Sequence, residues 1–190
     1  MDIKKIISES IAVKQSIIES EILNKNIEQV TNLIVSTYRN GGSVYFCGNG
    51  GSAADAQHIA AELSGRFYYD RPPLAAEALH VNTSYLTAVA NDYSYEEIYA
   101  RYINGAGKKG DILIGISTSG NSKNIIRAFE VAKEKGITAV ALTGESGGKM
   151  KEVADILINV PSADTPRIQE SHIMIGHIIC QFVESKLFPK

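Results

Sequence analysis

The sequence predicts a three-layer α/β sandwich, in which helices flank a parallel β-sheet and further helices precede the first strand. Short apolar runs of strand length alternate with segments of helical periodicity from residue 43 onward. Parallel strands need crossover helices, so this alternation favours a parallel sheet with helices on its faces. Two Gly- and hydroxyl-rich loops lie where an apolar run gives way to a helical pattern, which is typical of such folds.

The elements follow in order along one expected domain, residues 1–190. Isoleucines at helical spacing predict two helices within about residues 1–40, used in packing and oligomerisation and ending before Gly41-Gly42. Strands are expected at 43–46, 112–116, 138–142 and 156–160, followed by helices from Ser52, from Ser122, near Lys149 and from about Arg167. Between them, a short strand at 76–79 follows Pro72-Pro73, and a helix contains Ile98 and Tyr102.

Composition limits the class of protein. A chain of 190 residues with 44% hydrophobic side chains can bury a core, which excludes a disordered chain. The net charge of −2 and the absence of a Lys/Arg block argue against nucleic-acid and membrane partners. Cys47 and Cys180 match no zinc or redox spacing, and the N-terminus resembles neither a signal peptide nor a membrane span. We expect a soluble cytoplasmic protein.

The two loops indicate a phosphorylated ligand. Residues 47–52 follow the apolar run 44–46, and residues 117–122 follow 112–116. A strand that ends in such a loop and opens a helix directs unpaired N–H groups and the positive end of the helix dipole at one point. Ser117, Thr118, Ser119 and Ser122 add four hydroxyl groups, enough donors to surround a phosphate monoester.

No nucleotide cofactor is expected. Gly48 and Gly50 match only part of the dinucleotide-binding fingerprint, and no acidic residue ends a second strand about 20 residues later. Gly147-Gly148-Lys149 lacks the earlier glycine and the following Ser or Thr of a P-loop.

The helix after the first loop carries the more specific chemistry. Ser52 and Asp55 form the pattern of a variant capping box at its start. His58 and Glu62 then lie four residues apart on one helix face, near the expected phosphate site. Such a pair suits a metal ion or a positioned general base, and an ordinary surface ion pair is the alternative.

The last helix is predicted to be buried nearly all round, because its apolar residues spread over a broad arc. Such a helix packs on more than one neighbour, including another subunit. His172 lies on the apolar arc and is expected in the core, whereas His177 lies in a polar stripe with Glu184 and is exposed on the simplest interpretation.

Together these motifs resemble the phosphoheptose isomerases of the sugar isomerase (SIS) domain family, over essentially the whole chain. The resemblance is carried by Cys47-Gly48-Asn49-Gly50-Gly51-Ser52, His58-x-x-x-Glu62, Asn91-Asp92, residues 115–122 and Arg167-Ile168-Gln169-Glu170. It implies an SIS domain, which is flavodoxin-like. It also implies conversion of sedoheptulose 7-phosphate to D-glycero-D-manno-heptose 7-phosphate, the first step toward ADP-heptose for lipopolysaccharide or surface polysaccharide. Members are homotetramers with active sites between subunits.

The resemblance also implies residue roles. Glu62 is then the base that moves a proton through an enediol, and His177 is the acid that serves the oxygens. The implied phosphate contacts are Ser117, Thr118, Ser119 and Ser122, with Asn49, Gly50, Gly51 and Ser52 on the other side. The implied sugar contacts are Arg66, Asn91, Asp92 and Gln169, and the implied zinc ligands are His58, Glu62, Gln169 and His177. The family often has Asp or Ala before the Arg-Ile-Gln-Glu motif, where this chain has Pro166, with Asp164 two residues earlier.

A second resemblance belongs to a different functional class. The protein that associates with the bacterial replication initiator shares the fold, and residues 86–92 and 187–189 resemble it. That protein binds without catalysis and lacks the carboxylate and imidazole that this chain has at Glu62 and His177. We therefore favour the isomerase, on the principle that function is argued from the site. A phosphosugar-sensing regulator is disfavoured, because no DNA-binding module is recognisable.

Overall fold

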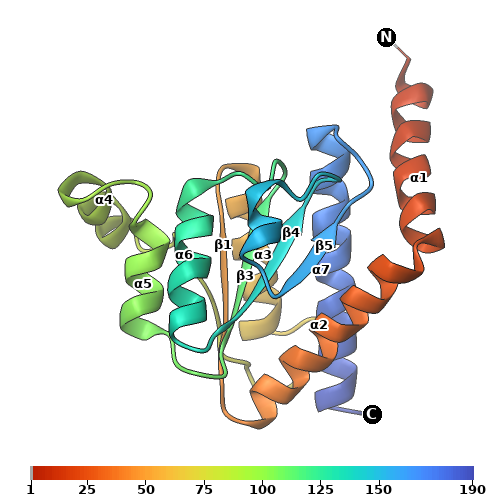
Figure 1. Cartoon of the computed structure of the whole chain (residues 1–190). Coiled ribbons are helices and arrows are strands. Elements are labelled where there is room, and N and C mark those ends of the chain that lie inside the picture. Colours follow the sequence, from red (N-terminus) through yellow and green to blue (C-terminus); the bar gives the residue numbers. More distant parts are fainter. Residues whose placement is uncertain (1) are drawn as a thin grey trace.

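The computed structural model describes residues 2–190; Met1, the first residue of the expected helical region, lies outside them. Within this range the chain alternates helices and strands as predicted (Figure 1). The helices are α1 (Ile3–Glu19), α2 (Glu21–Arg39), α3 (Gly51–Ser64), α4 (Thr83–Asp92), α5 (Ile98–Ala106), α6 (Lys123–Glu134), the 3₁₀ helix η1 (Gly148–Glu152) and α7 (Thr165–Leu187). The strands are β1 (Val44–Gly48), β2 (Ala76–Ala78), β3 (Ile112–Ser117), β4 (Thr138–Thr143) and β5 (Ile156–Asn159).

The five strands form one parallel sheet in the order β2-β1-β3-β4-β5. After β1 the chain moves outward to β2 and then returns to β3 on the other side of β1. The boundary between β1 and β3 is therefore the switch point at which open α/β sheets bind ligands, and the order is the flavodoxin-like one. Gly48 pairs with Ile116, so the two Gly-rich loops leave neighbouring strands at the same edge.

Helices cover both faces of the sheet, which confirms the three-layer prediction. Alternate strand residues contribute to two cores, because successive side chains point to opposite faces. Phe46 and Ile114 pack with α2, α3 and α7, whereas Tyr45 and Leu113 pack with α5 and α6 on the other face. Helices α3 and α7 therefore share one layer.

The N-terminal helices have different surroundings. Side chains cap both: Asp2 accepts from the Lys5 N–H at 3.1 Å, and Ser20 accepts from the Leu23 N–H at 3.3 Å. Helix α2 crosses α7 and buries one face, whereas α1 contacts the start of α7 through polar groups: Arg167 donates to the Ile6 oxygen at 2.9 Å and Ser10 donates to Glu170 at 2.6 Å. Five isoleucines of α1 stay exposed, namely Ile3, Ile6, Ile7, Ile11 and Ile18.

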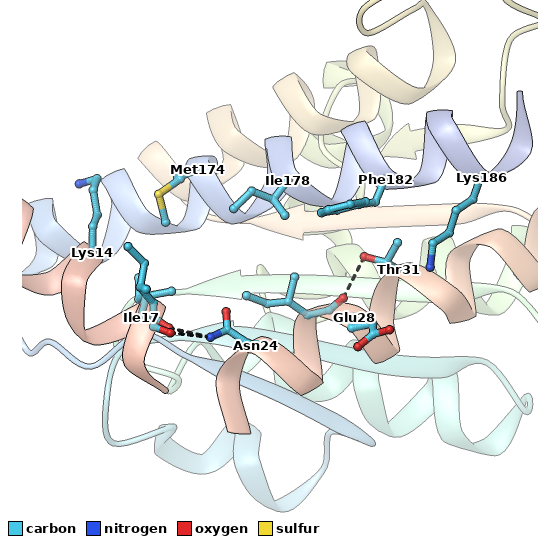
Figure 2. A pocket seen from close by; sticks show the side chains of 11 residues that line it. Lys14, Ile17, Asn24, Glu28, Thr31, Met174, Ile178, Phe182 and Lys186 are labelled. Atoms are coloured by element: carbon cyan, nitrogen blue, oxygen red, sulfur yellow. Dashed lines mark hydrogen bonds between the residues drawn. The ribbon is translucent and has the colours of Figure 1, made fainter. Parts of the chain in front are cut away.

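A cavity of about 400 Å³ is lined by residues of α1, α2 and α7 (Figure 2). Its lining combines aliphatic side chains, among them Ile17 and Ile178, with the ring of Phe182. The prediction that α7 is buried nearly all round is therefore wrong for this chain by itself, since Phe182 is 50% exposed. Glu184, expected in the polar stripe, is instead buried.

Helix α4 was not predicted. The segment between Arg71 and Tyr95 was expected to hold a short strand and then the next helix, but residues 83–92 form a helix of their own. Asn82 caps it by accepting from the Tyr85 N–H at 3.0 Å. Val89 is its one buried residue, so the segment lacks the apolar periodicity that reveals a helix.

Among residues 2–190, no helix is both long enough and apolar enough to cross a bilayer.

Candidate functional site

The first loop turns directly into α3. Gly50 has φ +56°, a conformation that suits glycine, and a Cβ on Gly48 would clash with the backbone of Ser52. Helix α3 begins at Gly51 with Gly50 as its N-cap, and no side chain caps it. The predicted Ser52–Asp55 capping box is therefore wrong, because the glycine turn starts the helix earlier and buries Ser52 within its first turn.

Asn49 joins the first loop to α6, the helix that follows the second loop. Its carboxamide and that of Asn124 form two hydrogen bonds, at 3.0 and 2.9 Å, and Asn49 Oδ1 also accepts from the Tyr95 hydroxyl at 3.0 Å. Asn124 is buried at the start of α6. The two loops at the switch point are thus held together by side chains as well as by the sheet.

The second loop presents its hydroxyl groups in two directions. Ser117 and Ser122 share a hydrogen bond of 2.9 Å between their Oγ atoms, close to the N-terminus of α6. Thr118 and Ser119 line a cavity of about 280 Å³ that lies between this loop, residues 144–146 and the start of α7. Two of the four predicted phosphate contacts therefore open into a cavity, while the other two bond to each other.

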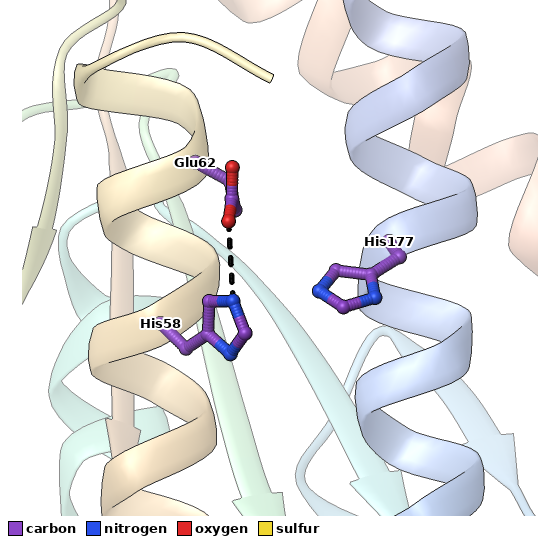
Figure 3. Close-up of side chains that lie close together, drawn as sticks. All are labelled: His58, Glu62 and His177. Carbon is purple, nitrogen blue, oxygen red and sulfur yellow. Dashed lines mark hydrogen bonds and ion pairs between the residues drawn. The ribbon is translucent and has the colours of Figure 1, made fainter. Parts of the chain in front are cut away.

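His58, Glu62 and His177 form one group between α3 and α7 (Figure 3). His58 Nε2 lies 3.1 Å from Glu62 Oε1, and the rings of His58 and His177 are 5.0 Å apart between centroids. One donor atom from each side chain lies within 4.8 Å of the other two. The side chain of His58 is 49% exposed and that of Glu62 is 25% exposed, so the group is open to a ligand. His177, expected in a solvated stripe, faces α3 instead.

Close packing of the two helices brings these side chains together. Gly176 is buried next to His177, and a Cβ there would lie 2.5 Å from Cδ1 of Ile59. Because glycine lets helices approach closely, α7 lies against α3 at the level of the group. The carboxylate and both imidazoles thus meet within one chain, without a second subunit.

Asp55 lies one turn before His58 on the same face of α3 and was not predicted as a site residue. Its Oδ2 atom is buried, and no hydrogen-bond partner for it occurs within residues 2–190. Burial raises the pKa of this carboxyl, and the neighbouring His58 and His177 partly oppose the rise. The spacing of Asp55, His58 and Glu62, at i, i+3 and i+7, is the sequence signal that could have identified it.

The structure brings only some of the other predicted contacts near this group. The side chain of Gln169, on α7, lies against the N-terminal end of α3. A Cβ on Gly51 would come 2.5 Å from the Nε2 atom of Gln169. Arg66 is exposed in the segment that follows α3. Asn91 and Asp92 are exposed at the end of α4, on the other face of the sheet from α7, and share a hydrogen bond of 2.9 Å.

The turn before the Arg-Ile-Gln-Glu motif is a regular helix start. Asp164 is the N-cap of α7, and Pro166 lies within the first two helical positions. Proline is favoured there because its missing N–H would have no partner inside the helix. Pro166 therefore fits the first turn of the helix that carries Gln169 and His177.

The donor set suits a divalent metal. Two imidazoles and a carboxylate are the ligand types of catalytic zinc sites, which use three protein ligands and keep a fourth position open. The described residues contain one such group of three His, Cys, Asp or Glu side chains, and it is this one. We find the residues present compatible with zinc.

Comparison with known proteins places the chain in a family. The model of the SIS domain matches residues 7–144. A phosphoheptose isomerase from Sulfurimonas denitrificans is 56% identical over 98% of this chain and 95% of its own length. Another, from Aneurinibacillus thermoaerophilus, is 56% identical over 98% of this chain and 94% of its own length.

Solved structures of phosphoheptose isomerases have the same fold as this chain. The phosphoheptose isomerase of Neisseria gonorrhoeae is similar with a TM-score of 0.90 and 42% identity, covering 96% of this chain and 97% of that one. The enzyme of Francisella tularensis gives a TM-score of 0.92 and 38% identity, covering 96% of each chain. The chain belongs to the SIS domain family and, within it, to the phosphoheptose isomerases.

Proposed function

We propose that this protein is an aldose–ketose isomerase that converts sedoheptulose 7-phosphate to D-glycero-D-manno-heptose 7-phosphate. The observation that carries the proposal is the meeting of the Glu62 carboxylate and the His177 imidazole between α3 and α7. A base and an acid within one group are what a proton transfer between adjacent carbons requires. Relatives at 56% identity that are named for this activity support the same conclusion.

In the proposed mechanism, Glu62 removes a proton from C1 of the ketose while His177 gives a proton to the oxygen on C2. The electrons of the broken C1–H bond form the C1–C2 double bond of the enediol, and the protonated oxygen on C2 becomes a hydroxyl. The carboxylic acid of Glu62 then returns its proton to C2, and His177 recovers a proton from the hydroxyl on C1, which becomes the aldehyde. Atoms and electrons balance without a redox cofactor.

The phosphate would lie at the switch point. Ser117, Thr118, Ser119 and Ser122 would donate hydroxyl hydrogen bonds, together with N–H groups at the start of α6. The first loop, residues 49–52, would close the other side, and Arg66, Asn91, Asp92 and Gln169 would contact the sugar hydroxyls.

Zinc would be held by His58, Glu62 and His177, with Gln169 as the further ligand that the family resemblance implies. When bound, the ion would polarise a sugar oxygen. Metal analysis of protein purified without chelator tests this assignment. We expect zinc in the wild type and its loss in His58→Ala.

We further propose a homotetramer whose active sites lie between subunits. Glu62 follows Gly51 by eleven residues, so about 16 Å of helical rise separates it from the first loop of its own chain. A second subunit could bring its loops closer to the open side of the Glu62 group. The exposed isoleucines of α1 and the cavity beside Phe182 supply apolar surface for such contacts, in line with the expected role of the N-terminal helices.

The product would feed ADP-heptose synthesis for lipopolysaccharide or surface polysaccharide. A non-catalytic partner of the replication initiator is not favoured. Such a protein would have no use for a carboxylate and an imidazole held at one open group.

The proposal is tested by incubating the protein with sedoheptulose 7-phosphate and measuring aldose formation. Glu62→Gln and His177→Ala should each lower kcat by about 10²- to 10⁴-fold, the usual contribution of general acid–base catalysis. Glu130→Gln is the matched control, because Glu130 is an exposed carboxylate on α6 that pairs with Arg127. Unchanged rates in the Glu62 and His177 variants would refute the assignment.

A further inference from the structure

A buried ion pair joins the segment after α3 to α7. The Nε atom of Arg71 donates to Oε1 of Glu184 at 3.1 Å, and each side chain is 1% exposed. Desolvation offsets much of the attraction between such charges, so a buried pair is weak evidence for a stabilising role. The hydrogen bonds around this pair indicate a geometric role.

The guanidinium of Arg71 binds the C-terminal end of α3. Its Nη2 atom donates to the backbone oxygen of Glu62 at 2.8 Å. Its Nη1 atom donates to the backbone oxygens of Leu63 at 2.8 Å and Gly65 at 3.1 Å. The last carbonyls of a helix lack partners inside it and favour a cation. Arg71 therefore holds the main chain of Glu62 itself.

The carboxylate of Glu184 binds the segment that leaves α3. It accepts from the backbone N–H groups of Phe67 at 3.0 Å and Tyr68 at 2.8 Å. Burial by itself would raise the pKa of Glu184, but the hydrogen bonds from Tyr68, Phe67 and Arg71 outweigh it and lower the pKa. The group is therefore an anion at neutral pH.

The pair connects both halves of the candidate site. Glu184 follows His177 by seven residues, two turns along the same face of α7. The ring of Phe67 lies 5.7 Å from the ring of His177 between centroids. One buried contact thus links the main chain of Glu62, the segment that carries Arg66, and the helix that carries His177.

We infer that Arg71 and Glu184 are positioning residues, whose ion pair sets Glu62 and residues 65–71 relative to His177. The expected effect on rate rests on the proposed isomerase function, whereas the expected effect on geometry does not. Positioning matters because a displacement of about 1 Å can lower a rate by about 10²-fold.

Two conservative variants test the inference. Arg71→Lys keeps the charge but loses the planar set of donors, and Glu184→Gln keeps the shape but loses the charge. In each, we expect kcat to fall by about 10- to 100-fold while KM changes much less. Arg127→Lys is the control and should keep the wild-type kcat, because Arg127 donates to Glu97 at the same 3.1 Å on the opposite face of the sheet.

A second measurement does not depend on activity. The ring signals of ¹³C-labelled histidine should shift for His58 and His177 in both variants, and stay in place for His80. Signals of His58 and His177 that keep their wild-type positions would overturn the inference. A loss of rate that is fully explained by the unfolded fraction of the variant, measured by thermal melts, would overturn it too. An inactive wild type would contradict the proposed function alone. If Glu184→Gln does not fold, Arg71→Lys carries the test.

Discussion

Helix α7 carries two histidines in contrasting environments. His172 is fully buried, and its Nε2 atom donates to the backbone oxygen of Thr143 at 3.1 Å. Burial lowers the pKa of His172 to about 4, partly opposed by this hydrogen bond, so the ring is neutral at pH 7. His177, five residues later, is partly exposed, and its ring faces the ring of His58 on α3. The first imidazole is structural, and the second is the one to which we assign the proposed proton transfer.

We predict that His172 makes the fold sensitive to acid. The pKa is 6.5 in the unfolded chain and about 4 in the folded one, so the unfolded state binds more protons between these values. The free energy of unfolding therefore falls as the pH drops through this window, by about 3 kcal/mol in total. His172→Gln keeps an N–H donor but does not titrate. Urea unfolding at about pH 7 and pH 4.5 should show a larger loss for the wild type than for this variant; equal losses would exclude His172 as the cause.

The sequence identified single residues well where their partners are local. His58 and Glu62 could be paired from their spacing of four, and His172 could be assigned to the core from the helical wheel. The partner of His177 lies over a hundred positions away, so no periodicity could show that it faces α3. For the same reason Glu184 was predicted on the surface, although Arg71 and the main chain of Phe67 and Tyr68 hold it in the interior.

Helices α3 and α7 form the candidate site because they pack closely, and Gly176 marks that contact. We predict that Gly176→Ala forces the helices apart next to His177, since the new Cβ would lie 2.5 Å from Ile59 Cδ1. Overpacking of this kind costs about 1–3 kcal/mol, which thermal unfolding should detect, and kcat should fall as well. Adding Ile59→Ala removes both atoms that the new Cβ would approach, Cδ1 at 2.5 Å and Cγ1 at 2.7 Å, and should restore much of the lost rate. A Gly176→Ala protein with wild-type stability and rate would show that the contact at Gly176 does not set the distance between α3 and α7.

Elements with strong periodicity or apolar runs were predicted to within a few residues, as for β3, β4 and α6. The failures have physical causes. Helix α4 buries only Val89 and so presents no apolar stripe. The start of α3 depends on a positive φ at Gly50, which a capping motif at Ser52 does not reveal.

Over the whole molecule, alternation of strands and helices predicted the parallel sandwich, but not the strand order. That order depends on the three-residue strand β2, which pairs beside β1 and creates the switch point between the two loops. A helical wheel predicts that a face is buried, but it does not say whether the same chain or another subunit covers that face. The wheel of α7 predicted burial that a single chain does not supply around Phe182.

The proposal that active sites are shared between subunits makes a prediction about mixed assemblies. A Glu62→Gln chain lacks the base, and a Ser119→Ala chain lacks a predicted phosphate contact. If each site combines Glu62 of one subunit with the second loop of another, the co-expressed variants should be more active than the average of the two separate variants. Size measurements should give a tetramer for both. Activity of the mixture that equals the average of the separate variants would place each site within one chain.

The central claim is that Glu62 moves a proton on a phosphorylated ketose beside His177. It is tested most directly by ¹H NMR of sedoheptulose 7-phosphate in D₂O with the wild type and with Glu62→Gln. We expect the wild type to form D-glycero-D-manno-heptose 7-phosphate, and the variant to leave the ketose and its C1 protons unchanged. A wild type that leaves the ketose unconverted, or a variant that converts it at the same rate, would contradict the account.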